Sequence, residues 1–186
     1  MAFKRLTIDG YGQLEINNCA FRRDGRIEAQ CAPDTSSFTS GKYLENGAVY
    51  AIDSVARKVK LPTGSDKLVA INYSAEHIYE AATGLKNFKL QPTGDFLPRL
   101  GYLSVGDKYT TNTVSYDSGE FANDAALISA LEALPTTPLY ATIATNDGSH
   151  LISATEDTTA ALQMLVVKKT TMPDGQLGIQ FQVYSV

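Results

Sequence analysis

The residues best suited to acid–base or nucleophilic chemistry are few in this sequence. Its two histidines, His77 and His150, each lack a second His or Cys nearby, so neither predicts a zinc site. In the stretch NDGSHL, Ser149 stands beside His150 and near Asp147, which are the residue types of a hydrolase. Adjacent residues of a strand point to opposite faces, so Ser149 and His150 are not expected to share a proton. The stretch predicts a turn over 146–149, and both histidines are expected in exposed loops.

Three carboxylates precede a predicted helix: Asp117, Glu120 and Asp124. Their oxygens could bind calcium, although their spacing matches no known loop motif. Capping and the helix dipole also explain acids at this place, so calcium stays open. The stretch GYGQLE at 10–15 lacks the third glycine of a dinucleotide-binding fingerprint. The sequence therefore predicts no cofactor and no enzymatic activity.

The composition indicates one globular domain that is suited to binding other molecules. The 186 residues fit a single β-rich domain over 1–186. Charged residues make up only 19% of the chain, which has ten Tyr and no Trp. Tyrosine suits surfaces that are wet in one state and dry in another. The net charge of −4 argues against direct nucleic-acid binding, which needs a basic patch. No apolar run is long enough for a signal peptide or a membrane span, so we expect a protein made in the cytosol, with no membrane partner.

Asp-Gly and Asn-Gly pairs between alternating apolar runs predict a mainly β fold, an antiparallel sandwich or barrel of hairpins. In CAFRRDGRIEAQC, a three-residue loop ending at a left-handed Gly25 separates apolar from polar faces best. That register makes Cys19 and Cys31 diagonal neighbours, too far apart for a disulfide, so both are predicted free and core-facing. It also sets Arg22 opposite Arg26 on the outer side. Like charges that face each other favour an acidic partner, while a solvated face is the alternative.

Two stretches break the β pattern. FANDAALISALEALPTTP predicts a helix over about 124–134, capped by Asn123 or Asp124 and packed on a sheet. YSAEHIYEAATG reads either as a short second helix over about 75–83 or as a strand that runs into a loop. Residues 84–120 are dense in Gly and Pro and are predicted as a long, mostly extended excursion.

The final stretch, QLGIQFQVYSV, alternates apolar and polar residues and predicts a half-buried strand. It carries no charge that would protect a sheet edge, so we expect a neighbouring strand to cover it, within the fold or from another subunit. The preceding ALQMLVVKKT reads as a strand buried on both faces. The candidate partner contacts are Arg22, Arg26, Gln180, Gln182 and Tyr184.

The run LVAINYSAEHIYEAATGLKNFKL, followed by LPRLGYLSVGDKYTTNTVSYD, resembles the middle of small structural proteins of tailed bacteriophage heads, of the decoration or cement type. The resemblance covers roughly residues 67–117 and includes no site motif. It implies a non-enzymatic virion component, assembled in the host cytoplasm, that binds the major capsid protein on the outside of the head as a homo-oligomer.

Two alternatives remain open. A ligand- or carbohydrate-binding β-sandwich would use Tyr43, Tyr50 or Tyr109 as a stacking platform, although the lack of Trp weakens this reading. A small hydrolase would use His77 or His150.

Overall fold

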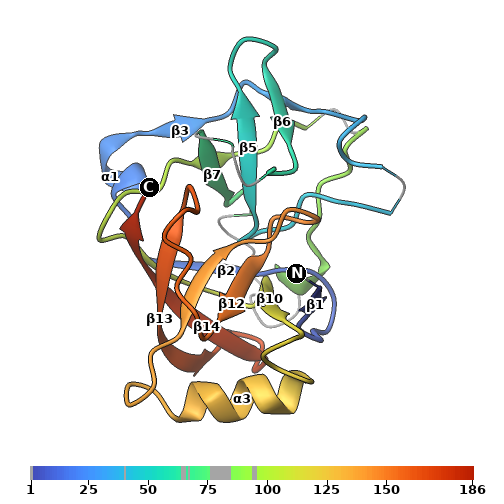
Figure 1. Cartoon of the computed structure of the whole chain (residues 1–186). Coiled ribbons are helices and arrows are strands. Elements are labelled where there is room, and N and C mark those ends of the chain that lie inside the picture. The colour runs from blue at the N-terminus through green and yellow to red at the C-terminus, as the bar shows by residue number, and fades with distance from the viewer. Residues whose placement is uncertain (1, 40, 64–65, 67, 76–84, 94–95) are drawn as a thin grey trace.

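The chain forms two β-sheets, so the predicted mainly β fold of sandwich type is confirmed. The computed structural model describes residues 2–39, 41–63, 66, 68–75, 85–93 and 96–186. The larger sheet contains, in spatial order, β1 (Phe3–Arg5), β10 (Val114–Asp117), β12 (His150–Ser153), β11 (Tyr140–Ile143), β13 (Gln163–Thr171), β14 (Leu177–Ser185), β9 (Lys108–Thr111) and β2 (Leu14–Asn18). The smaller sheet contains β3 (Ile27–Glu28), β8 (Leu100–Gly101), β7 (Val69–Asn72), β5 (Val49–Asp53), β6 (Lys58–Lys60) and β4 (Ala32–Pro33). In Figure 1 the smaller sheet lies above the larger one.

The two sheets are mixed, with antiparallel pairs in the majority. Two strand pairs, β10 with β12 and β4 with β6, are parallel, and the other pairs of described strands are antiparallel. A parallel neighbour needs a long connection, because a tight hairpin can join only antiparallel strands. The connection from β10 to β12 is made by α3 (Asp124–Glu132) and by β11.

The terminal strand β14 lies inside the larger sheet and is no edge. It pairs with β13 along one side and with β9 along the other. The sequence predicts that a neighbouring strand covers β14, either within the fold or from another subunit, and the structure shows the first of these alternatives. The predicted alternation is confirmed, because Ile179, Phe181 and Val183 are fully buried on its inner face. The prediction for β13 is wrong, because Leu165 is 36% exposed and only one face of that strand is buried.

The stretch predicted as the second hairpin folds differently. Residues Ala20–Asp24 form the short helix α1, which ends at Gly25 in the left-handed conformation with φ +69°. β3 follows and pairs with β8 instead of with residues 17–21. The left-handed glycine is thus confirmed and the hairpin is wrong. Both cysteines are free and buried as predicted, but they lie in separate apolar clusters and are not cross-strand neighbours.

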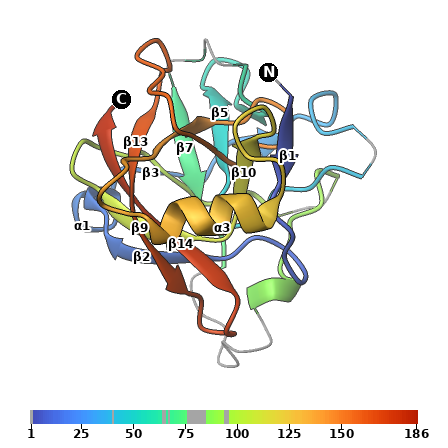
Figure 2. The same ribbon diagram turned by 60° about the horizontal axis from the view of Figure 1, so that its bottom comes forward.

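The helix predicted over 124–134 is confirmed as α3. The Asn123 side chain accepts a hydrogen bond from the amide of Ala126 at 3.0 Å, and Leu127 and Leu131 are buried. Figure 1 shows α3 at the end of the molecule remote from the smaller sheet, and in Figure 2 it lies in front of the strands of the larger sheet. The proposed helix over 75–83 falls almost wholly outside the described residues.

Residues 84–120 take part in both sheets. They contain the 3-10 helix η1 (Leu85–Asn87), β8, β9 and β10. The prediction of an extended excursion is therefore wrong from residue 100 onward. Short runs such as KYTT and VSYD pair with distant strands, and local sequence does not show such partners.

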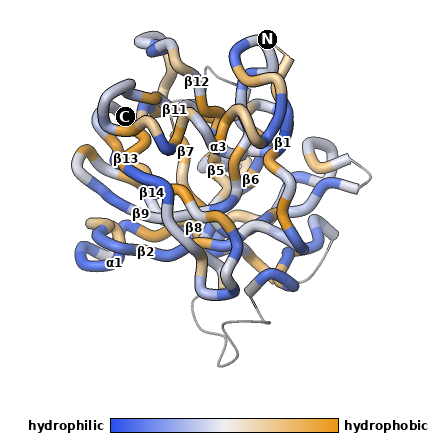
Figure 3. Tube along the Cα trace, turned by 90° about the horizontal axis from the view of Figure 1, so that it is seen from below, coloured by the Kyte–Doolittle hydropathy of each residue, from blue (hydrophilic) through white to orange (hydrophobic). Residues whose placement is uncertain are grey.

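Two apolar clusters form the core. The larger one lies between the inner face of the larger sheet, α3 and one face of the smaller sheet. The second covers the other face of the smaller sheet. β5 contributes Val49 to the first cluster and Tyr50 to the second, which explains why four of its five residues are buried. Figure 3 shows hydrophobic residues along β11, β12 and α3 and hydrophilic ones on α1 and β2.

Candidate interaction surface

One row of cross-strand neighbours crosses the outer face of the larger sheet through six strands. From β12 to β2 its members are Ser153, Tyr140, Leu165, Gln182, Lys108 and Asn18. Directly paired residues lie on the same face of a sheet, and all six are half-buried or exposed. Met164 and Val183, which alternate with them, are buried. The row therefore marks the solvent side of the sheet, which we call the outer face, and Lys108 is its one charge.

Three predicted contacts, Gln180, Gln182 and Tyr184, lie on this outer face. The Gln180 amide donates to the Asn17 side chain at 3.0 Å, which also accepts from Thr110 at 2.9 Å. The Tyr184 hydroxyl donates to Glu156 at 2.8 Å. Gln180 and Tyr184 are thus held in place by neighbours, and all three side chains are half-buried. They remain candidate contacts because they lie on the outer face. They are not contacts of an unpaired edge strand, because β14 is paired on both sides.

The two predicted arginines do not face each other across a hairpin. Arg22 belongs to α1, and Arg26 follows that helix and donates to the Ser104 hydroxyl. Both are exposed. The like-charge argument for an acidic partner therefore no longer holds.

A cavity of about 520 Å³ adjoins the outer face beside β11 and β12. Its lining includes Tyr140, Thr142, Leu151 and Ser153 from these strands, and residues 155–157 and 159 from the segment that follows. Four carboxylates also line it: Asp117, Glu120, Glu156 and Asp157. Its described lining residues include no Lys or Arg. The cavity is therefore negatively charged.

Local hydrogen bonds fix two of the acidic side chains beside the cavity. Asp157 accepts from the hydroxyl and the amide of Thr159 at 2.6 and 2.9 Å, which lowers the pKa of Asp157. Burial, followed by the hydrogen bond to Glu156, raises the pKa of Tyr184 to about 12. The Tyr184 hydroxyl therefore keeps its proton and remains a hydrogen-bond donor to Glu156. Such a site fits a cationic group or a ligand rich in hydroxyl donors.

The three carboxylates considered for calcium have separate structural partners. Glu120 accepts from the Ala154 amide at 2.6 Å, and Asp124 accepts from the Tyr116 hydroxyl at 2.6 Å. Asp117 accepts from the Gly119 amide at 2.8 Å. Within the described part of the chain, no group of three or more His, Cys, Asp or Glu residues is arranged to hold a metal ion. The cap of α3 is Asn123, so the hydrogen bonds of these acids join strands and turns and do not cap the helix.

Ser149 and His150 point away from each other, as predicted. Both are buried, so the prediction of an exposed His150 is wrong. The His150 ring lies 3.1 Å from the Thr113 carbonyl through Nδ1 and 2.8 Å from the Tyr109 hydroxyl through Nε2. Ser149 instead contacts Asp147 at 2.7 Å and the Ser115 hydroxyl at 2.6 Å. The predicted turn is confirmed, with Gly148 at φ +77°, and His77 lies outside the described residues.

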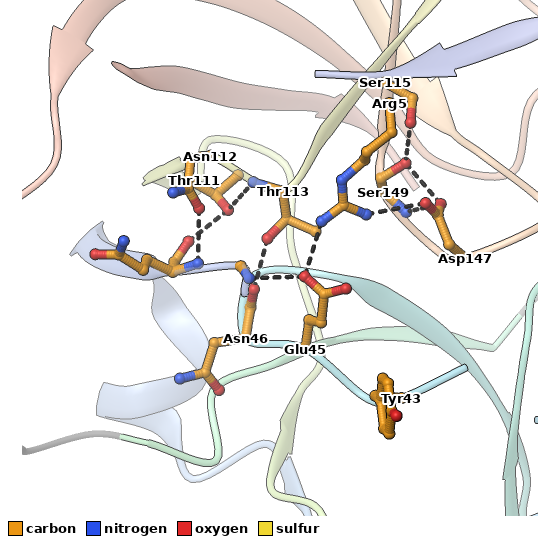
Figure 4. A network of polar contacts seen from close by, with 12 residues as sticks. Arg5, Tyr43, Glu45, Asn46, Thr111, Asn112, Thr113, Ser115, Asp147 and Ser149 are labelled. Atoms are coloured by element: carbon orange, nitrogen blue, oxygen red, sulfur yellow. Dashed lines mark hydrogen bonds and ion pairs between the residues drawn. The ribbon is translucent and has the colours of Figure 1, made fainter. Parts of the chain in front are cut away.

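A polar network joins the two sheets beside this turn (Figure 4). Arg5 of β1 donates to Glu45 at 2.8 Å and to Asp147 at 2.9 Å. Glu45 also accepts from the Gly12 amide at 2.7 Å. Burial alone would lower the pKa of Arg5, but the two carboxylates outweigh it and raise that pKa. Because each charge has a charged partner, this network acts as a structural clamp.

The tyrosines proposed as a sugar-stacking platform are mostly inaccessible. Tyr50 and Tyr109 are fully buried. Tyr43 is half-buried and packs edge-on against Tyr11, with ring centroids 5.9 Å apart. Tyr140, which the sequence reading missed, is the tyrosine that lines the 520 Å³ cavity.

Comparison of the chain with protein-family models, with curated proteins and with solved structures gives no match. None of the described helices has the length and apolar character needed to cross a bilayer.

Sequence reasoning missed the centre of the outer face for an identifiable reason. Leu165 stands within the apolar run MLVV, where alternation is hidden because Leu165 points outward and Val166 inward. Tyr140 follows the loop after α3 and has only a four-residue strand to show its period. Leu165 is assigned to the outer face by its pairing with Gln182 of β14, and Tyr140 by its pairing with Leu165.

Proposed function

We propose that this chain is a non-enzymatic structural protein of a phage head, a decoration protein that binds the capsid lattice through the outer face. The interaction role is carried by one observation, the row of six half-buried or exposed side chains that holds a single charge. The choice of partner rests on the resemblance over residues 67–117.

The composition of the row supports binding by side chains. Tyr140 and Leu165 supply apolar area at its middle, and Gln182 supplies hydrogen-bonding groups beside them. Protein interfaces are depleted in charged residues at their core and enriched in tyrosine. Ser153 and Asn18 at the two ends give the row a polar rim.

Cosedimentation with purified heads that lack the decoration layer tests this function. The wild-type protein is expected to pellet with the heads at micromolar concentration and to saturate. A double variant, Leu165→Lys with Gln182→Lys, places two charges at the centre of the face and is expected to stay in the supernatant. Leu165 and Gln182 are cross-strand partners and Gln182 also faces Lys108, so the added like charges should lower the free energy of unfolding by about 1 kcal/mol, and denaturant unfolding checks that the variant is still folded.

Val55→Lys is the matched control, because Val55 is 98% exposed and lies in the turn between β5 and β6 of the smaller sheet. It changes an exposed apolar residue to lysine outside the outer face and should pellet like the wild type. Failure of the wild-type protein to pellet, or equal pelleting of the double variant, would contradict the proposal.

A second function is favoured by the cavity beside the outer face. Its 520 Å³ volume lies within the roughly 300–1,000 Å³ of small-ligand sites. Tyr140, Glu156 and Ser153 could contact a sugar or a cationic ligand there. A glycan array followed by calorimetry tests this role, and Glu156→Gln should weaken any ligand that the array identifies. An array without signal would contradict carbohydrate binding.

A further inference from the structure

Asn46 and Gly47 form a chemically labile pair just before β5. Asn46 is the only asparagine of the sequence that is followed by glycine. A backbone nitrogen can attack the Cγ of the preceding asparagine and displace its side-chain amide, and asparagine is accordingly a thermolabile residue. The attack is least hindered when glycine follows, because glycine has no Cβ. Loss of a side-chain amide from this chain is therefore expected first at Asn46.

The fold requires glycine at position 47. Gly47 has φ +76°, and a Cβ there would lie 2.2 Å from the Thr111 hydroxyl oxygen and 2.9 Å from the Gln13 carbonyl oxygen. The Thr111 hydroxyl is itself bonded to that carbonyl at 2.6 Å, so it is fixed and cannot turn aside without losing this contact. Packing therefore imposes the sequence context in which Asn46 is most labile.

The fold also makes specific use of the Asn46 amide. The residue is fully buried, its Oδ1 accepts from the Ala75 backbone amide at 3.3 Å, and its Nδ2 donates to the Ala75 carbonyl at 3.4 Å. Its own carbonyl accepts from the Thr113 hydroxyl at 2.7 Å (Figure 4). An amide side chain offers a donor and an acceptor, whereas a carboxylate offers acceptors only. A carboxylate at this position would therefore face the Ala75 carbonyl without a proton between them.

The folded chain keeps the two reacting groups apart. The attacking group would be the Gly47 nitrogen, and its N–H donates to the Asn72 carbonyl at 2.8 Å. The Asn46 side chain cannot turn its Cγ toward that nitrogen without giving up both contacts with Ala75. Residues 46–52 are all buried, so the water that the reaction consumes is also excluded. The pair becomes reactive only when this segment opens.

We propose that Asn46 is a deamidation site that folding closes and unfolding opens, and that its conversion prevents the chain from returning to the native fold. In the opened chain, the Gly47 nitrogen attacks Cγ of Asn46 and a new N–Cγ bond forms. The Cγ–Nδ2 bond breaks, and ammonia leaves with the proton of the Gly47 N–H. Water then opens the succinimide at either carbonyl, which gives an aspartyl or an isoaspartyl residue at position 46.

Neither product fits the folded site. The new carboxylate would be buried, and Arg5, the cation of the clamp between the sheets, already pairs with Glu45 and Asp147. A buried charge without a partner is strongly unfavourable. The isoaspartyl form also adds a methylene to the backbone between two bonds that hold the sheets together, the one to Thr113 of the larger sheet's β9–β10 turn and the one to Asn72 of β7. Unfolding that lasts long enough for conversion therefore becomes irreversible.

Peptide mapping by mass spectrometry tests the closure. The full chain is incubated in mildly alkaline buffer, unfolded in guanidinium chloride in one arm and folded in sodium chloride of equal concentration in the other. The peptide that contains Asn46 is expected to change from amide to acid in the unfolded arm. In the folded arm the rate should be at least about a hundredfold lower, because unfolded fractions are roughly 10⁻³ or less. Asn146 is the internal control, because it is exposed but is followed by Asp147, and it should convert slowly in both arms.

Variants and refolding test the consequence. Asn46→Asp installs the product charge directly, and it is expected either not to fold or to unfold at a clearly lower denaturant concentration. Asn146→Asp makes the same change at an exposed turn position and should unfold like the wild type. When the unfolded wild type is held for increasing times and then diluted, the native fraction should fall in step with the unconverted fraction of Asn46.

Several results would overturn the proposal. Equal conversion of Asn46 in the two arms, or none in the unfolded chain, rejects the closure. Full recovery of converted chains, or an Asn46→Asp variant as stable as Asn146→Asp, rejects the block to refolding. If chains diluted at once do not refold, the comparison of these two variants decides alone. None of these measurements involves a partner, so the proposal stands or falls independently of capsid binding.

Discussion

Protonation of His150 should lower the free energy of unfolding, because the imidazole ring is buried in the core. The ring is 1% exposed and stacks on Phe181 with centroids 4.6 Å apart. Nδ1 lies 3.1 Å from the Thr113 carbonyl and so carries the proton of the neutral ring, while Nε2 accepts from the Tyr109 hydroxyl. Both nitrogens are thus satisfied in the neutral form. A second proton would put a charge in the core.

Burial lowers the pKa of His150 from 6.5 to about 4, with a smaller contribution of the same sign from the charge on Arg5. As pH falls, the unfolded chain takes up a proton near its ordinary pKa, whereas the folded chain does so only near 4. Stability is therefore complete above pH 6.5 and is lost between 6.5 and 4. The expected loss in free energy of unfolding is about 1.4 kcal/mol near pH 5.5 and about 2.5 kcal/mol near pH 4.5.

Guanidinium denaturation at several pH values measures this loss. His77→Gln is introduced in every protein compared, so that one histidine titrates. His150→Phe is the control, because a phenyl ring can stack on Phe181 but cannot take up a proton. In this variant the Tyr109 hydroxyl can donate to the Met164 sulfur, 2.9 Å away, in place of the ring nitrogen. Carboxylates with lowered pKa, such as Asp157, lose their contribution only at lower pH. Equal pH dependence of the two proteins above pH 4.5 would refute the argument.

Three further predictions concern the fold. Glu45→Gln should destabilise the protein by about 2 kcal/mol in denaturant unfolding, because it removes one of the two carboxylates of the partly exposed Arg5 clamp. Gly148→Ala should cost at least about 2 kcal/mol in the same measurement, because the glycine has φ +77° and a Cβ there would lie 2.3 Å from a carbonyl oxygen of β5. Thiol titration of the unreduced protein should give two thiols in denaturant and slow reaction in the folded state, since Cys19 and Cys31 are free and buried and burial raises the pKa of Cys19 to about 12.

The parts of the fold that sequence predicted are those whose signal is local. The helix α3 carries its own cap at Asn123 and its own apolar stripe. The left-handed Gly25 and the turn over 146–149 follow from residue types that tolerate those conformations. The inner face of β14 follows from alternation alone. In each case the deciding residues lie within a few positions of one another.

The parts that sequence missed depend on neighbours far along the chain. Alternation shows which face of β14 is buried, but it does not show which strands flank it, because strands pair through backbone groups common to all residues. The sequence pattern of a half-buried strand is therefore the same whether the strand lies at the edge or at the centre of a sheet. α1 was missed for a related reason, since Phe21 reaches the core from a helix as well as from a hairpin.

The position of β14 also determines what kind of contact this protein can make. An edge strand would bind a partner through backbone hydrogen bonds, which depend little on side chains. The edges of the larger sheet are instead β1, which carries Lys4 and Arg5, and β2, and Pro33 lies in β4 at an edge of the smaller sheet. Lysine and proline at edges discourage strand addition. A partner that meets the outer face must therefore match Tyr140, Leu165 and Gln182 by shape and hydrogen bonding, so substitutions there should alter partner choice more than they alter the fold.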